Sequence, residues 1–135
     1  MRILFICKFN RFRSKVAEAL ARHYIRRKDV EVKSAGLMID FMRPFMAQPV
    51  VEMLNHRDIL IPNQKSELIN DQMIKWADKI IVVSGDCPIG NLPAGKVEIW
   101  PIGDASDHDQ ASILIRINEI ENYVQQMADR LNNKR

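Results

Sequence analysis

Short apolar runs alternate along the chain with segments whose apolar residues follow helical spacing. Four short runs rich in apolar residues predict strands over residues 3–6, 30–34, 80–83 and 97–100, and the run over 80–83 predicts a buried one. Helical spacing predicts helices over residues 14–27, 46–56 and 70–76, and a long helix near the C-terminal end. A loop is expected after the second strand, to about residue 43.

The C-terminal helix has the clearest apolar stripe in the chain. Its apolar residues recur at spacings of four and three, at Ile113, Ile117, Ile120, Val124, Met127 and Leu131. Such a stripe predicts an amphipathic helix that covers one face of a sheet. Asp107 with Gln110 is the N-cap pair expected to open this helix, and residues 132–135 are expected to fray.

This order of elements predicts the fold. Strands that alternate with helices, two of them apolar throughout at residues 3–6 and 80–83, indicate a parallel sheet covered by helices on both faces, a three-layer α/β/α domain. Residues 1–135 are expected to form that single domain. Ligands of such sheets bind at the carboxyl ends of the strands, where Cys7 and Asp104 would both lie.

The segment that follows the first strand predicts a phosphate site with a nucleophile inside it. The run from Ile3 to Ile6 ends at Cys7, a loop of five residues follows, and Arg13 and Ser14 open a helix. Loop amides and a helix N-terminus that point into one concavity bind oxyanions.

Three residues of this segment have roles that follow from their chemistry. The positive potential should hold Cys7 as a thiolate, which is the attacking species. The planar guanidinium of Arg13 would bridge two phosphoryl oxygens, and the Ser14 hydroxyl would donate to the Cys7 sulfur. A packed core thiol is the alternative for Cys7, and a left-handed turn is one reason for an asparagine at position 10.

The chain resembles the low-molecular-weight protein tyrosine phosphatases and their arsenate reductase relatives. The resemblance is carried by Cys7-Lys8-Phe9-Asn10-Arg11-Phe12-Arg13-Ser14 with Ala17-Glu18-Ala19-Leu20, by Ser34-Ala35-Gly36 and Ala77-Asp78, and by Trp100 with Asp104. It implies a four-stranded sheet of order 2-1-3-4 and a phosphocysteine intermediate. It also implies that Asn10 braces the loop and that Asp104 is the general acid. The loop from Lys8 to Ser14 would then bind phosphate.

Some positions depart from the family pattern. Phe9 stands where many members have glycine, and Phe12 where some have a second cysteine. The acid loop usually reads Asp-Pro, whereas this chain has Asp104-Ala105. Asp107 and Asp109 are therefore alternative candidates for the general acid. Each of the three aspartates, Asp104 included, could instead be an ordinary turn residue or a charge at the start of a helix.

Cys87 separates the function hypotheses. The segment Ser84-Gly85-Asp86-Cys87-Pro88 resembles the region where arsenate reductases of this fold have redox cysteines. With one cysteine there, an internal three-cysteine relay is excluded. Reduction by an external thiol, a protective disulfide between Cys7 and Cys87, and an inert thiol stay open.

The segment from Gly36 to Gln48 is expected to form a variable wall of the pocket. It carries several methionine and phenylalanine residues together with Arg43-Pro44. These apolar residues either contact substrate or pack on the core, and Arg43 either starts a helix or contacts a substrate anion.

Composition excludes several classes of protein. At 135 residues and 47% apolar content the chain can bury a core, and no apolar run is long enough for a membrane span or a signal peptide. We expect a cytoplasmic monomer. Two cysteines make neither a disulfide framework nor a zinc site, and no metal or cofactor is expected.

Positive charge is concentrated near the N-terminus. Residues 1–33 hold ten of the 20 lysine and arginine residues and three of the 17 acidic ones. These cations are either a solvated helix face or a field that steers acidic substrates toward Lys8 and Arg11. A nucleic-acid module is disfavoured, because few aromatic residues are interleaved with them.

Three functions therefore stay open. The first is a phosphomonoesterase acting on a phosphotyrosine protein or a small aryl phosphate, in which Cys7, Arg13 and Asp104 are catalytic. The second is arsenate reduction with an external thiol. The third is a module that binds phosphate or another oxyanion without turnover.

Overall fold

The computed structural model describes residues 1–133 and contains one sheet of four parallel strands. The order is β2-β1-β3-β4, which confirms the predicted topology. The strands are β1 (Arg2–Cys7), β2 (Glu31–Gly36), β3 (Lys79–Val83) and β4 (Val97–Trp100). In the register of β1 and β2, Cys7 lies opposite Gly36, so both strands end beside the loop that follows Cys7.

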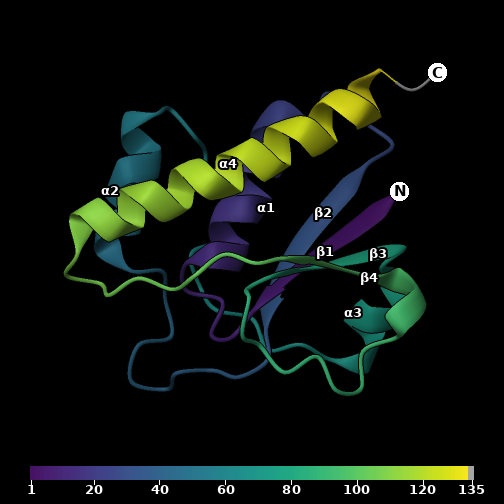
Figure 1. Ribbon diagram of the computed structural model, residues 1–135, viewed down its shortest axis with the longest axis horizontal. Coiled ribbons are helices and arrows are strands. Elements are labelled where there is room, and N and C mark those ends of the chain that lie inside the picture. The colour runs from purple at the N-terminus through teal and green to yellow at the C-terminus, as the bar shows by residue number, and fades with distance from the viewer. Residues whose placement is uncertain (134–135) are drawn as a thin grey trace.

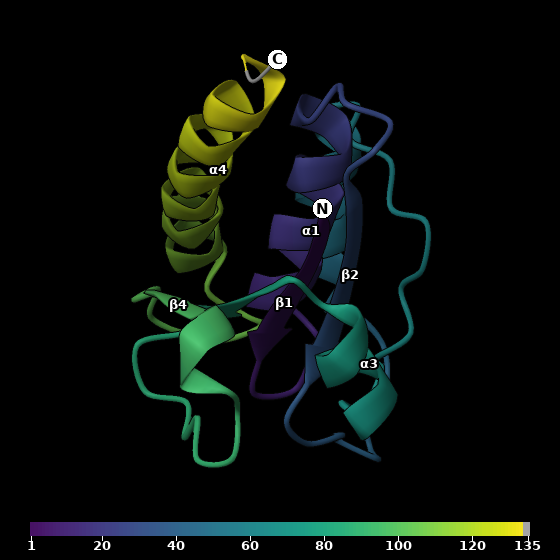
Figure 2. The ribbon, with the colours of Figure 1, turned by 90° about the vertical axis from the view of Figure 1, so that its right-hand side faces the viewer.

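Helices cover both faces of the sheet, as Figures 1 and 2 show. One face carries α1 (Arg13–Tyr24), α2 (Gln48–His56) and α4 (Gln110–Asn132). The other face carries α3 (Asp71–Trp76) and the chain around the short 3-10 turn η1 (Ala94–Lys96), which the sequence did not predict. The three-layer arrangement is therefore as expected.

Alternate residues of β1 explain why its sequence is apolar throughout. Ile3 and Phe5 pack in the core beneath α1 and α4, whereas Leu4 and Ile6 pack in a second core against α3. A strand that is buried on both faces has no polar side, so its sequence does not show the alternation of apolar and polar residues that is typical of a half-exposed strand.

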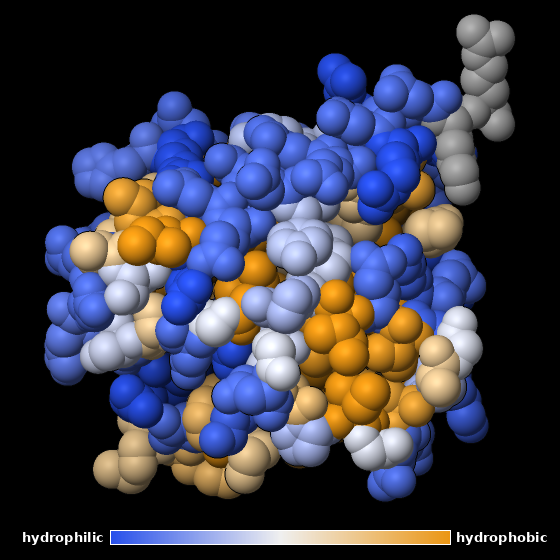
Figure 3. All heavy atoms as spheres, in the orientation of Figure 1, coloured by the Kyte–Doolittle hydropathy of each residue, from blue (hydrophilic) through white to orange (hydrophobic). Residues whose placement is uncertain are grey.

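The stripe of α4 packs on the first core as predicted. All six of its predicted residues are buried, and Figure 3 shows mainly hydrophilic residues over the outer face of this helix. Within residues 1–133, no helix is long and apolar enough to cross a membrane.

The ends of α1 and α4 correct two predictions. α1 ends at Tyr24 instead of residue 27, and α4 continues through Asn132, which was expected to fray. One side chain explains both differences, because Asn132 donates to the carbonyl oxygen of Tyr24 and accepts from the amide of Arg26. Residues 134–135 lie outside the described residues.

The N-cap of α4 is Asp109, so the predicted pair of Asp107 and Gln110 is wrong. The Asp109 carboxylate accepts from the amide and the hydroxyl of Ser112, at 3.0 and 2.8 Å. Asp107 is instead bound by two arginines from distant loops.

Candidate functional site

The loop of residues 8–12 joins β1 to α1 at the carboxyl edge of the sheet. It turns at Asn10, whose φ of 54° lies in the left-handed region that asparagine tolerates. It also packs closely on Gly36, because a Cβ atom there would lie 2.9 Å from the carbonyl carbon of Phe9 and 3.0 Å from the amide nitrogen of Asn10. We call this segment the phosphate loop.

The Asn10 side chain lies fully buried beneath the phosphate loop and uses all of its hydrogen-bonding groups. Its amide nitrogen donates to the hydroxyls of Ser14 and Ser34, at 2.7 and 3.0 Å, and its oxygen accepts from the amide of Glu67 at 2.9 Å. Ser34 in turn donates to Glu18 at 2.6 Å. This network links the phosphate loop to α1, to β2 and to the segment around Glu67.

The backbone of the phosphate loop is oriented with its carbonyl groups outward. The carbonyl oxygens of Lys8, Asn10, Arg11 and Phe12 accept hydrogen bonds from surrounding residues. Within residues 1–133, the amides of Phe9 to Phe12 donate to no protein acceptor. A set of free amides at the start of a helix is a binding site for oxyanions.

The Cys7 sulfur lies 3.0 Å from the Ser14 hydroxyl oxygen. That oxygen already accepts from Asn10, so its own hydrogen is free to be donated to the sulfur. Ser14 is fully buried and Cys7 is nearly so. The Ser14 hydroxyl is therefore placed to donate to the Cys7 sulfur.

One nitrogen anchors the guanidinium of Arg13. Its Nη1 donates to the Ser84 hydroxyl at 3.0 Å and to the Ile102 carbonyl oxygen at 2.9 Å. Among the described residues, its Nε and Nη2 find no hydrogen-bond acceptor. These two nitrogens form the edge of the guanidinium that binds two oxygens of a phosphoryl group at once.

Most predicted site residues meet in one cavity of about 260 Å³. Its lining includes Cys7, Lys8, Phe9, Arg11, Phe12, Arg13 and Asp104. Asn10 and Ser14 are not in the lining, because their side chains are buried below it. The structure thus brings together the proposed nucleophile, the oxyanion groups and an acid.

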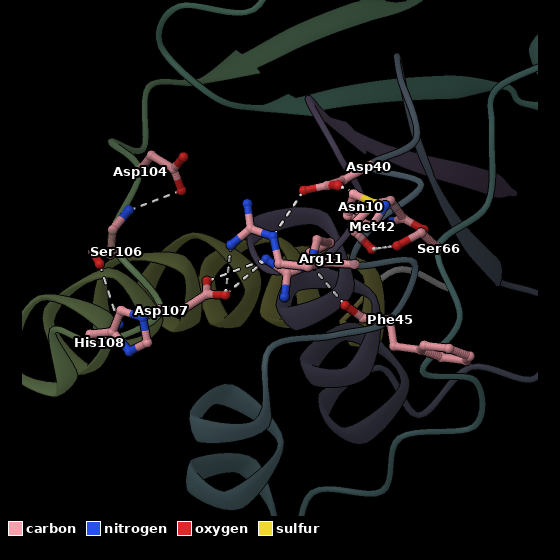
Figure 4. A network of polar contacts seen from close by, with 12 residues as sticks. Asn10, Arg11, Asp40, Met42, Phe45, Ser66, Asp104, Ser106, Asp107 and His108 are labelled. Atoms are coloured by element: carbon pink, nitrogen blue, oxygen red, sulfur yellow. Dashed lines mark hydrogen bonds and ion pairs between the residues drawn. The ribbon is translucent and has the colours of Figure 1, made fainter.

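The three candidate acids have different surroundings, shown in part in Figure 4. Asp104 lines the cavity, its side chain is 63% exposed, and it lies 3.9 Å from the Nε of Arg13. Asp107 also lines the cavity, but its carboxylate is held by Arg11 and Arg43. Asp109 caps α4. Asp104 is therefore the carboxyl group best placed to reach a leaving group.

Cys87 is half-buried and does not line the cavity, and both cysteines are free thiols. Burial raises the pKa of the Cys87 thiol above its ordinary value, which lowers its thiolate fraction at neutral pH. No group of three or more metal-binding side chains is found among residues 1–133.

Half of the ten basic residues in residues 1–33 pair with carboxylates. Arg11 pairs with Asp107, Arg22 with Glu18 and Arg27 with Asp29. Lys15 is buried on α1, where its ammonium donates to the carbonyl oxygen of Asn63 and burial lowers its pKa. A field that steers substrate would therefore be weaker than the sequence suggests.

Sequence reasoning missed the partners that fix the site. Ser84 anchors Arg13, and Asp107 joins Arg11 to Arg43. Each contact links residues more than 60 positions apart, and no local pattern signals it. Ser34, which accepts a hydrogen bond from Asn10, could have been found from the sequence, because it belongs to the Ser34-Ala35-Gly36 motif of the family resemblance.

The family with the description "Low molecular weight phosphotyrosine protein phosphatase" matches residues 2–98. This match covers well over half of the chain and includes the phosphate loop. The chain belongs to this family. The matched region ends before the loop that carries Asp104 and Asp107.

Individual relatives carry two kinds of name. An arsenate reductase of Shouchella clausii (strain KSM-K16) is 34% identical over 107 residues, which are 76% of this chain and 72% of the relative. An arsenate reductase of Staphylococcus xylosus is 35% identical, with 76% of each chain covered. A low-molecular-weight protein tyrosine phosphatase structure from T. tengcongensis superposes with a TM-score of 0.84 over 97% of this chain and 99% of the other, at 21% identity. That likeness shows the fold alone.

Proposed function

We propose that the protein is a cysteine-dependent phosphomonoesterase that acts through a phosphocysteine intermediate. The observation that carries the proposal is the cavity itself, in which Cys7, the free edge of Arg13 and Asp104 face one space. The substrate class is a phosphotyrosine protein or a small aryl phosphate.

In the first step the Cys7 thiolate attacks phosphorus. A sulfur–phosphorus bond forms while the bond from phosphorus to the leaving oxygen breaks. The loop amides and the Nε and Nη2 of Arg13 stabilise charge on the phosphoryl oxygens, and Asp104 gives its proton to the leaving oxygen. The alcohol or phenol then departs.

In the second step water hydrolyses the phosphocysteine. Asp104, now ionised, takes a proton from the water as it attacks phosphorus, and the sulfur–phosphorus bond breaks. The hydrogen bond from Ser14 to the departing sulfur at 3.0 Å stabilises the thiolate that forms. Inorganic phosphate leaves and Cys7 returns to its starting state.

The names of the curated relatives favour a second candidate, the reduction of arsenate. Cys7 would attack arsenic and displace one of its oxygens as water, and an external thiol would then attack the Cys7 sulfur. That attack releases arsenite, leaves a mixed disulfide on Cys7 and moves two electrons from sulfur to arsenic. A second thiol restores Cys7. Cys87 is poorly suited to the resolving step, because burial raises its pKa.

The test compares the reduced wild-type protein with Cys7→Ser. Hydrolysis of a chromogenic aryl phosphate between about pH 5 and 8 that disappears in Cys7→Ser, with phosphate binding retained, supports the phosphatase. Substantial turnover in the variant contradicts a covalent mechanism. Arsenite formation that needs both Cys7 and an added thiol identifies a reductase, and tight phosphate binding without either reaction identifies a binding module.

A further inference from the structure

Three loops meet at one carboxylate beside the cavity. Asp107 lies in the loop between β4 and α4 and accepts from the Nη1 of Arg11 at 3.0 Å and the Nη1 of Arg43 at 3.2 Å. Arg11 belongs to the phosphate loop, and Arg43 belongs to the segment of residues 37–47. Figure 4 shows Asp107 pointing toward Arg11, away from Asp104.

Both arginines are held by further contacts. The Nε of Arg11 donates to the carbonyl oxygen of Phe45 at 2.9 Å, and the Nε of Arg43 donates to Asp40 at 2.9 Å. The side chains of Arg11 and Asp107 are only 13% and 27% exposed. A pair shielded in this way is less screened by water and salt than a surface pair. Asp107 is therefore fixed relative to Cys7.

Asp104, by contrast, is held by weaker contacts, of which the one to another segment is the 3.9 Å approach to the Nε of Arg13. Its side chain accepts a hydrogen bond from the amide of the next residue, Ala105, and is 63% exposed. Its position depends on the loop backbone, which leaves the core at Ile102 and reaches the N-cap of α4 at Asp109. Between these ends, the Ala105 side chain packs on the core, and the Asp107 carboxylate ties the loop to Arg11 of the phosphate loop.

We propose that Asp107 is a positioning residue that holds the general acid Asp104 over Cys7 by clamping its loop to Arg11 and Arg43. We call these three residues the arginine clamp. The inference rests on the proposed function and adds to it a residue that touches neither substrate nor reacting atoms. It also assigns a role to Arg11 in the phosphate loop other than contact with phosphate.

The activity test uses Asp107→Ala and phosphate esters with good and poor leaving groups. A displaced acid slows esters that need protonation, and general acids contribute about 10²–10⁴-fold. We expect kcat to fall about tenfold for phenyl phosphate and less than twofold for 2,4-dinitrophenyl phosphate. Asp104→Asn should give the same selectivity with a larger loss. Equal slowing of both esters, or no slowing, overturns the positioning role.

Matched variants separate the clamp from a general effect of removing a charge. Asp29→Ala removes an exposed aspartate that pairs with Arg27 far from the cavity, and it should leave both rates unchanged. Arg43→Ala should lower the rate for phenyl phosphate about threefold, and the double variant should be no slower than Asp107→Ala alone, because the two residues act through one contact. Fully additive losses contradict the clamp. Asp107→Asn, which keeps the volume, serves if Asp107→Ala does not fold.

Hydrogen exchange tests the clamp without turnover. The amides of Ala105 and Asp109 should exchange faster in Asp107→Ala than in wild type, and at the wild-type rate in Asp29→Ala. Unchanged exchange in Asp107→Ala overturns the clamp whatever the activity. If the wild-type protein shows no Cys7-dependent hydrolysis, the proposed function is wrong. The role of the clamp in protonating the leaving group is then wrong as well.

Discussion

Gly36→Ala should damage the phosphate loop from beneath. A Cβ at this position would lie 2.8 Å from the carbonyl oxygen of Met38, 2.9 Å from the carbonyl carbon of Phe9 and 3.0 Å from the amide nitrogen of Asn10. Ordinary contacts begin at 3.4 Å, so the backbone has to move by about 0.4 to 0.6 Å. All three atoms belong to the main chain, and no side chain can rotate to make room.

The size of the effect follows from that displacement. Overpacking of this kind typically destabilises a protein by about 1–3 kcal/mol. A misplacement of about 1 Å can reduce catalysis about 10²-fold, so a shift of half that size should lower kcat/KM on the order of tenfold. Affinity for inorganic phosphate should fall as well, because the same loop amides bind it.

The assay measures kcat/KM for an aryl phosphate, affinity for inorganic phosphate and the free energy of unfolding in urea. Gly95→Ala is the matched control, because a Cβ at Gly95 meets no atom within 4 Å. It should change none of the three quantities. If Gly36→Ala keeps kcat/KM and phosphate affinity within twofold of wild type, the loop does not depend on this close contact.

Two further predictions concern buried groups at the site. Asn10→Ala should lower the free energy of unfolding, measured in urea, by about 2–5 kcal/mol, because it removes three hydrogen bonds and places alanine at a φ of 54°. Asn10→Gly relieves only the strain of the backbone. It should therefore recover part of the stability and little of the activity. A loss below about 1 kcal/mol would show that the network is unimportant. In the Cys7→Ser variant, an alkylating reagent should modify Cys87 more slowly at pH 8 in the folded protein than in the urea-unfolded protein. Burial raises the pKa of this thiol, so the reactive thiolate forms only at higher pH. Equal rates of modification, measured by mass spectrometry, would contradict this prediction.

The sequence predicted the parts of the fold that depend on local pattern. The stripe of α4 is confirmed, since helical spacing of apolar residues reports directly on which face is buried. The turn at Asn10 was also foreseen, because a left-handed backbone selects few residue types. β1 and β3 followed from the uninterrupted apolar runs at residues 3–6 and 80–83.

Contacts between distant segments could not be predicted in this way. Asp107 and Asp109 look alike in sequence, and both stand where a helix is about to begin. Asp109 becomes the N-cap because its carboxylate reaches the amide of Ser112, and Asp107 is drawn to Arg11, 96 residues earlier. The end of α1 depends likewise on Asn132, at the far end of the chain.

The two candidate reactions need different groups besides Cys7. Ester hydrolysis needs an acid for the leaving oxygen, and Asp104 faces the cavity. Arsenate reduction needs a second thiol, and Cys87 lies outside the cavity lining with its pKa raised by burial. In a reductase with this cavity, an external thiol would have to reach Cys7 within the space that Arg11, Arg43 and Asp107 help to line. Opening the clamp with Asp107→Ala should therefore speed any thiol-dependent arsenate reduction while it slows hydrolysis of poor esters, and a parallel loss of both would argue against this division.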